Sequence, residues 1–194
     1  MPTVWPFIPR DEFAETLVWS ADTLRAYSAE QRFKIGKAPR QRLNFDHALS
    51  PRQYQRARLL MYNGAASEWV VPLWYEKQTF TASSGATSIT CTTTYSDFRV
   101  AGVAVLWQDA ETYETVTISA VGGSSLTVSA LSRTYTGALI MPGVQAYCVD
   151  GMSAERSVDD YVFASVEFKV FGNADLADGG LYGSYRSHPV ISDA

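Results

Sequence analysis

Alternating apolar and polar residues predict β-strands along much of this chain. The clearest alternation lies in residues 161–171, where every second residue from Val162 to Val170 is apolar. One face of this strand is therefore expected to be buried, as in an inner strand of a sheet. Residues 144–149 predict another strand shortly before it.

The first half of the chain alternates less regularly. Residues 13–26 predict a strand near residues 15–20, although the spacing of their apolar residues also fits a helix. Residues 31–35 and 40–46 alternate better and predict the two strands of one hairpin. The apolar run at residues 69–74 contains a proline, which places it at a sheet edge.

One short helix is predicted between these strands. Ser50 has the side chain of a helix N-cap, and Pro51 suits the first helical position. Apolar residues then recur at helical spacing as far as Met61, and Asn63-Gly64 ends the pattern.

The composition changes after this region. Residues 79–94 are rich in serine and threonine and carry no charge. Short strands are predicted at residues 100–107, 114–120 and 125–129, as in a small antiparallel barrel or sandwich. The turn residues Met141-Pro142-Gly143 are expected to close this unit with an exposed junction.

These patterns predict a mainly β fold: a discontinuous antiparallel β-sandwich with one short helix and a small inserted, barrel-like β-domain. Residues 1–77 and 145–171 would form the sandwich, and residues 78–144 the insert. Residues 172–194 are glycine-rich and are expected to form a C-terminal arm that is ordered by contact.

Charge is unevenly distributed. The 194 residues carry a formal charge of −4, which is not the charge of a dedicated nucleic-acid-binding protein. Eight of the 16 Lys and Arg residues lie between Arg32 and Arg58, a basic band with Asp46 as its one acid. Acidic residues dominate after Asp109. Such opposite ends favour head-to-tail contact between copies, with two solvated faces of a monomer as the alternative.

Few residues point to chemistry. His47 and His188 do not form a zinc-ligand spacing with Cys91 and Cys148, which are predicted to be buried free thiols. A Cys–His nucleophile pair stays open, because its partners need only meet in space. No nucleotide-binding or hydrolase motif occurs.

A cluster of carboxylates could suggest glycoside hydrolysis, which needs two carboxyl groups that face each other across a cleft. Asp109, Glu111 and Glu114 lie beside a predicted turn, where solvation is the expected state. We therefore expect no catalytic residue, no metal and no cofactor. The chain also has no apolar run of the ~20 residues needed to span a bilayer.

Several short motifs in the first eighty positions occur in a suggestive order. They are Trp5-Pro6, Trp19, Asp22-Thr23-Leu24, Glu30-Gln31-Arg32, Pro39-Arg40, the helix start at Ser50 and Val71-Pro72-Leu73-Trp74. Together they resemble the opening part of distal tail proteins, a family of minor tail proteins at the tail tip of tailed bacteriophages. The rest of the chain resembles that family only loosely.

This resemblance implies a structural protein of the virion, assembled in the host cytoplasm. The family forms a ring of six copies that joins the tail tube protein to a hub or baseplate protein. The insert would lie outside the ring, and it is too short for the large carbohydrate-binding appendage of some relatives. Neither membrane binding nor sequence-specific nucleic-acid binding is implied.

Two alternatives stay open. One is a carbohydrate-binding β-module in a virion, with Trp107, Tyr113 and Tyr135 exposed on one face of the insert. The other is a small hydrolase that uses Cys148 or the carboxylates near Asp109.

Six residues are candidates for contacts between subunits. The arginines of the basic band could pair with carboxylates of a neighbour. Trp5 lies in a proline-rich arm without periodicity, where a large aromatic side chain is a plausible interface anchor. Two tyrosines of the C-terminal arm could act in the same way. The candidates are Trp5, Arg32, Arg40, Arg42, Tyr182 and Tyr185.

Overall fold

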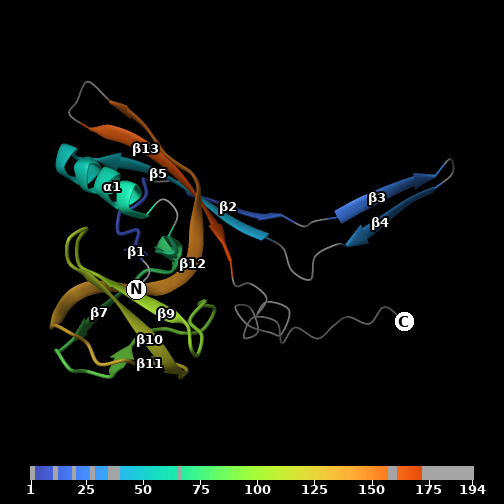
Figure 1. The fold of residues 1–194 in the computed structure, drawn as a ribbon. Helices are drawn as coiled ribbons and strands as arrows, with labels where there is room; N and C mark the ends of the chain where they lie inside the picture. The colour runs from blue at the N-terminus through green and yellow to red at the C-terminus, as the bar shows by residue number, and fades with distance from the viewer. Residues whose placement is uncertain are drawn as a thin grey trace, which may run out of the picture.

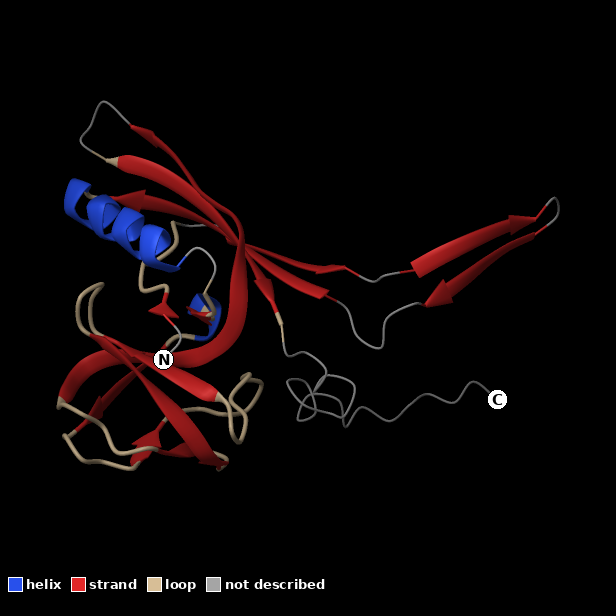
Figure 2. Ribbon diagram, in the orientation of Figure 1, coloured by secondary structure: helices blue, strands red, loops and turns tan. Residues whose placement is uncertain are grey.

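A computed structural model describes most of the chain, and one sheet dominates it (Figures 1 and 2). The described residues are 3–10, 13–18, 21–26, 29–34, 40–64, 67–156 and 161–171. Their elements are β1 (Thr3–Val4), β2 (Phe13–Val18), β3 (Ala21–Ala26), β4 (Ala29–Lys34), β5 (Arg40–Leu49), α1 (Pro51–Gly64), β6 (Trp69–Pro72), the 3-10 helix η1 (Trp74–Glu76), β7 (Gln78–Ala82), β8 (Ser88–Thr90), β9 (Val103–Trp107), β10 (Tyr113–Val121), β11 (Ser125–Val128), β12 (Tyr135–Arg156) and β13 (Val162–Val170).

The main sheet has 11 strands, in the order β2-β5-β13-β12-β9-β10-β11-β8. Strands β6 and β7 pair along β12, and β1 adds to β6 in parallel, whereas the other pairs are antiparallel. The predicted mainly β, antiparallel fold with one short helix is therefore confirmed. The strand predicted near residues 15–20 is β2, and the regular strand at residues 161–171 is β13, which lies between two neighbours as an inner strand.

Strand β12 links the two halves of the molecule. Over its 22 residues it pairs with β7 and β9 at one end and with β6 and β13 at the other. The predicted exposed junction at Met141-Pro142-Gly143 is wrong, because Pro142 is buried inside this strand. Proline is accommodated because one edge of β12 has no strand partner at this position. The pairing with β7 ends at Ile140, and the pairing with β6 begins at Gly143.

The N-terminal half forms two nested hairpins. The predicted pairing of residues 31–35 with 40–46 is wrong, because β4 pairs with β3 and β5 pairs with β2. Only two residues separate β3 from β4, and such a short connection closes a hairpin with little loss of entropy. The β3–β4 hairpin is a separate two-stranded sheet that projects from the body of the protein (Figure 1).

Helix α1 starts as predicted, through a reciprocal cap. The backbone N–H of Gln53 donates to Ser50 Oγ at 3.3 Å, and the backbone N–H of Ser50 donates to Gln53 Oε1 at 3.0 Å. The helix buries Ala57, with Tyr54, Leu60 and Met61 packed against the core.

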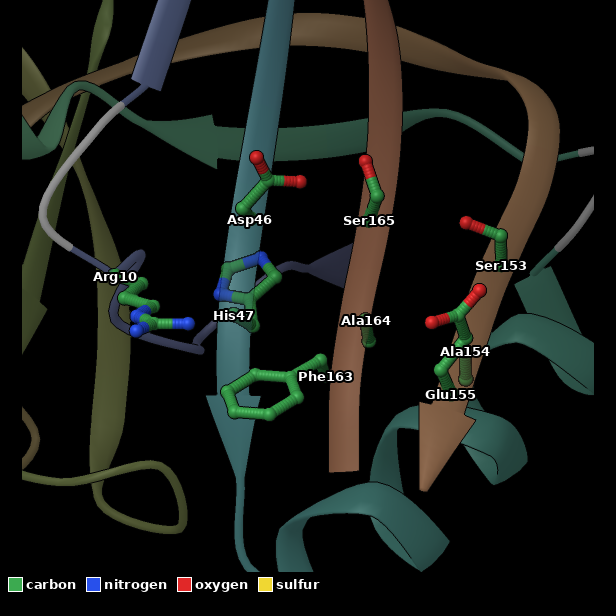
Figure 3. A pocket seen from close by; sticks show the side chains of 9 residues that line it. All are labelled: Arg10, Asp46, His47, Ser153, Ala154, Glu155, Phe163, Ala164 and Ser165. Atoms are coloured by element: carbon green, nitrogen blue, oxygen red, sulfur yellow. The ribbon is translucent and has the colours of Figure 1, made fainter. Parts of the chain in front are cut away.

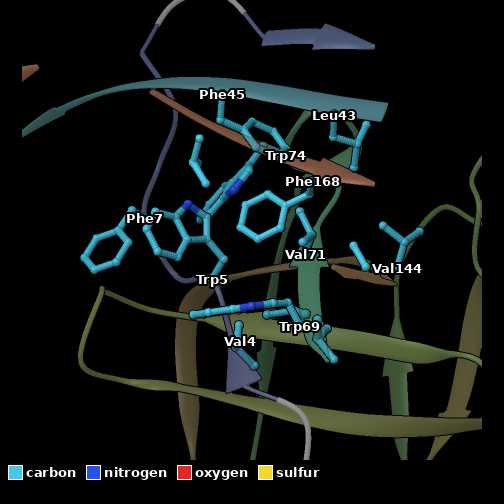
Figure 4. Packing of buried hydrophobic residues seen from close by; sticks show 14 of the residues in the cluster. Val4, Trp5, Phe7, Leu43, Phe45, Trp69, Val71, Trp74, Val144 and Phe168 are labelled. Carbon is cyan, nitrogen blue, oxygen red and sulfur yellow. The ribbon is translucent and has the colours of Figure 1, made fainter. Parts of the chain in front are cut away.

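Buried residues form two clusters. The first core combines the N-terminal segment with β5, β6 and β13, and it contains the aromatic residues Trp5, Phe7, Phe45, Trp69, Trp74 and Phe168 (Figure 4). The second core consists of residues between Phe80 and Ile140, all inside the predicted insert. From residues 78–144 the first core also takes Val105, Ala110, Met141 and Val144, so the two cores share strands β9 and β12.

Candidate functional site

Trp5 is part of the first core, so the prediction that it lies outside its own subunit's core is wrong. Its side chain has 0% exposure, and its ring lies 4.9 Å from Phe7 and 5.7 Å from both Trp69 and Phe168 (Figure 4). The arm needs no periodicity of its own, because the backbone N–H of Trp5 donates to Val70 O at 3.0 Å beside β6. Trp5 is consequently unavailable as an interface anchor in this fold.

His47 holds the N-terminal segment on the sheet. Its Nε2 accepts the indole N–H of Trp5 at 3.0 Å, and its Nδ1–H donates to Ile8 O at 3.0 Å. Burial lowers the pKa of His47, which agrees with a neutral ring that uses both nitrogens. Sequence reasoning missed this role, although His47 is in phase with the buried residues of β5.

A groove of about 700 Å³ opens beside His47, over strands β5, β13 and β12 (Figure 3). The guanidinium of Arg10 lies 4.9 Å from the centre of the Phe163 ring, and the Arg10 backbone N–H donates to Asp46 O at 2.6 Å. The lining residues are Arg10, Asp46, His47, Ser153, Ala154, Glu155, Phe163, Ala164 and Ser165.

The groove offers polar contacts rather than catalytic groups. Both nitrogens of His47 are engaged, so it cannot serve as a general base there. The Ser165 hydroxyl donates to Asn44 Oδ1 at 3.3 Å, and Arg10 already covers the Phe163 ring. The groove could accept a polar ligand, and the aromatic ring that lines it, Phe163, already has the Arg10 guanidinium over it.

Four arginines of the basic band have partners in their own chain. Arg42 pairs with Glu167 at 3.0 Å, and Arg52 pairs with Glu111 at 2.8 Å. Two others stack on tyrosine rings, each with its guanidinium carbon 5.7 Å from the ring centre. These pairs are Arg56 with Tyr113 and Arg58 with Tyr54. The carboxylate partner sought for Arg42 in a neighbour is thus present in the same subunit.

The structure locates two of the other interface candidates, Arg40 and Arg32. Arg40 begins β5 opposite Val18, and Arg32 lies in β4 opposite Thr23 on the projecting hairpin. Tyr182 and Tyr185 lie outside the described residues, as do residues 172–194 as a whole.

The three carboxylates considered for catalysis each have a structural partner. Asp109 Oδ1 accepts the backbone N–H groups of Glu111 and Thr112 at 2.7 Å, and these bonds lower the pKa of Asp109. Glu111 pairs with Arg52, and Glu114 accepts the hydroxyl groups of Ser132 and Tyr135. A lowered pKa is the opposite of what a general acid needs.

The aromatic residues proposed to bind carbohydrate do not share an exposed face, so that prediction is wrong. Tyr135 is fully buried in the second core. Trp107 is half-buried: its indole N–H donates to Pro6 O at 2.8 Å and its ring packs against Trp74. Tyr113 is also half-buried and lies beneath Arg56. The insert uses these rings for packing within the chain.

The two thiols are free, as predicted. Burial raises the pKa of Cys91 to about 11 and also raises the pKa of Cys148. Both thiols are therefore poor nucleophiles at neutral pH. They belong to different regions, because Cys91 lies in the second core and Cys148 packs against the first.

A pair of carboxyl groups, the half-buried Glu76 and the buried Asp97, was not anticipated from the sequence. Glu76 Oε2 accepts the Ser96 hydroxyl at 2.6 Å and the Asp97 backbone N–H at 2.7 Å. Burial and the neighbouring Glu76 raise the pKa of Asp97 to about 7. These residues are far apart in sequence and lie outside periodic segments, so no local pattern pairs them.

The described residues offer no further ligand site. Across the residues that the structure describes, no group of three or more His, Cys, Asp or Glu side chains is arranged to hold a metal ion. None of the described helices is long and apolar enough to cross a membrane. Comparison with models of protein families and with curated proteins finds no match.

Proposed function

We propose that this chain is a structural protein of a bacteriophage tail. Copies form a ring at the distal end of the tail tube, between the tube protein and a hub or baseplate protein. The order of motifs over the first eighty residues supports this function, and the resemblance implies six copies in the ring. A mainly antiparallel β fold is compatible with it.

The projecting β3–β4 hairpin carries the proposal. Its two strands pair with each other and not with the main sheet. An isolated two-stranded ribbon is marginally stable in water, because it cannot bury an apolar face. A neighbouring subunit supplies the missing contact in a ring.

The distribution of charge also favours the β3–β4 hairpin as a contact between copies. Residues 29–42, which include the second strand of the hairpin, contain five basic residues and one acidic residue. A segment with this excess of positive charge attracts the acidic half of another copy. The catalytic alternatives have less support, because Asp109, Glu111 and Glu114 already serve structural contacts.

The test compares the mass of the native protein with that of a variant whose hairpin is shortened. Residues 21–34 are replaced by Asn-Gly, which leaves the β2 and β5 sequences unchanged. We expect the full chain to form a closed oligomer with six subunits, seen by native mass spectrometry and electron microscopy. We expect the shortened variant to be a monomer with nearly the same thermal midpoint.

Two single substitutions control for unwanted effects of the deletion. Arg32→Glu, on the hairpin, should weaken assembly, whereas Arg58→Glu, on the exposed side of α1, should not. Normal assembly of the shortened variant would exclude the hairpin as the contact. A full chain that stays monomeric in the presence of tail tube protein would contradict the proposed function.

A further inference from the structure

Three carboxyl groups from three different elements meet beside the second core. Glu15 lies in β2, Glu76 ends η1, and Asp97 lies in the loop between β8 and β9. The loop is joined to η1 by the two hydrogen bonds that Ser96 and Asp97 donate to Glu76. Glu15 is joined to β5, since Gln41 Nε2 donates to Glu15 Oε1 at 2.7 Å.

Buried acceptors in this cluster lack partners. Asp97 is 4% exposed, and its Oδ1 has no hydrogen-bond partner among the described residues. Gln41 is buried, and its Oε1 is also without a partner in that part of the chain. An unpaired buried carboxylate is costly, and it is usually neutralised by an opposite charge, a metal or a proton. Arg99 supplies an opposite charge, but burial and the neighbouring Glu76 outweigh it, so a proton is the group that neutralises Asp97.

We propose that Asp97 is protonated while the 91–102 loop is hydrogen-bonded to η1, and that ionisation of Asp97 weakens these bonds by repulsion and loosens the loop. The charged groups that face Asp97 are Glu76 from η1, Glu15 from β2 and Arg99 from its own loop. An ionised Asp97 is repelled by Glu76 and Glu15 and attracted by Arg99. Its negative charge therefore lies beside the Glu76 carboxylate that accepts the hydrogen bonds from Ser96 and from the Asp97 backbone, and the repulsion opposes this contact.

The backbone of the 91–102 loop is strained, and the contact with η1 helps to hold it in place. Tyr95 and Ala101 have φ angles of 60° and 63°, in the left-handed region that residues with a side chain rarely occupy. Such strain persists where surrounding contacts enforce it. The same loop presents Tyr95 and Val100 with 81% and 61% of their surface exposed. Loosening the loop therefore changes an exposed apolar surface. Because the pKa of Asp97 is about 7, this change is centred near neutral pH.

The direct test follows Asp97 in the full-length wild-type protein. Carbon-13 NMR of the side-chain carboxyl should show that Asp97 titrates near pH 7, well above an ordinary aspartate. Hydrogen exchange of the 93–102 amides, corrected for intrinsic rates, should show about tenfold less protection one unit above that pKa than one unit below. An Asp97 that titrates below about pH 5 would overturn the proposal.

Variants separate protonation from packing. Asp97→Asn mimics the neutral acid and should keep the loop protected at all pH values tested. Glu76→Gln retains an acceptor for Ser96 and should move the transition to lower pH, because it removes one repelling charge. The exposed Asp150→Asn is the control and should leave the wild-type transition unchanged. If Asp97→Asn keeps the wild-type pH dependence, the proton resides elsewhere; if it does not fold, the wild-type titration decides.

Discussion

The two cores of this protein are built in opposite ways. The first core collects aromatic side chains from distant parts of the chain, including Trp5, Phe45, Trp69 and Phe168. The second core draws on one continuous stretch from Phe80 to Ile140 and is mostly aliphatic. The first must close long loops before its residues meet, whereas the second needs contacts of shorter sequence separation. Large aromatic side chains compensate because each buries more apolar surface.

The largest effect is expected from removing Trp5. Trp5→Ala deletes the centre of the first core and the donor to His47, and it should cost about 3–5 kcal/mol of unfolding free energy. Leu126→Ala in the second core should cost about 2–5 kcal/mol. Denaturant unfolding measures both values.

Hydrogen exchange shows whether the two cores respond separately. Trp5→Ala should lower protection in β5, β6 and β13 while β8, β10 and β11 keep theirs. Leu126→Ala should do the reverse. Uniform loss of protection in both variants would mean that the cores unfold as one unit.

Gly143 tests the strand that the cores share. A Cβ at this position would lie 2.8 Å from Val70 Cγ1 and 3.1 Å from Val105 Cγ2. Gly143→Ala should therefore cost about 1–3 kcal/mol through overpacking. Gly123→Ala is the matched control, because nothing lies within 4 Å of its added carbon, and it should change stability by less than about 0.5 kcal/mol. Equal thermal midpoints for the two variants would show that β12 adjusts freely.

The two regions should also respond oppositely to pH. The folded state lowers the pKa of His47, so protons bind the unfolded chain first as the pH falls below 6.5, and stability falls. The folded state raises the pKa of Asp97 from 3.8 to about 7, so stability rises as the pH falls through that window.

Unfolding measured across this range can separate the two groups. Asp97→Asn removes the opposing contribution and should make the loss of stability in acid steeper, whereas His47→Gln should make it shallower. The same pH dependence in both variants and in the wild type would exclude these two residues as its source.

The smallest effect is expected at the helix cap. Ser50→Ala removes the acceptor for Gln53 and should cost about 1 kcal/mol. Because α1 packs on the first core, the change in hydrogen exchange should spare the second core. Ser50→Asn retains a capping oxygen and should behave like the wild type. A cost near zero for Ser50→Ala would show that packing of Ala57 alone defines the start of the helix.

Local patterns in the sequence predicted elements better than their pairing. The alternation of β13 and the Ser50-Pro51 helix start are both found in the structure, because each depends on neighbours along the chain. The partner of β4 depends on the pairing of β5 with β2, and the burial of Pro142 depends on a gap between two other strands. Neither feature can be predicted from the periodicity of neighbouring residues.

The candidate site was harder to predict for the same reason. Trp5 was assigned to an interface because it lacks periodicity, yet a parallel contact with β6 buries it. Glu76 and Asp97 are joined only by tertiary structure. His47 was missed as well, although its phase within β5 is a local signal that indicates burial.

The shared strand also limits how the length of this chain can change in evolution. Side chains alternate between the faces of a strand, so inserting one residue into the regularly paired stretch of β12, between its irregular segments at 135–138 and 148–152, would turn over every position on one side of the insertion. Residues that now fill one core would face solvent, and the register with β6, β9 or β13 would be lost. The two-residue connection between β3 and β4 has no such constraint, because the hairpin ends there. Insertions and deletions should therefore accumulate at the hairpin tip and be absent from β12.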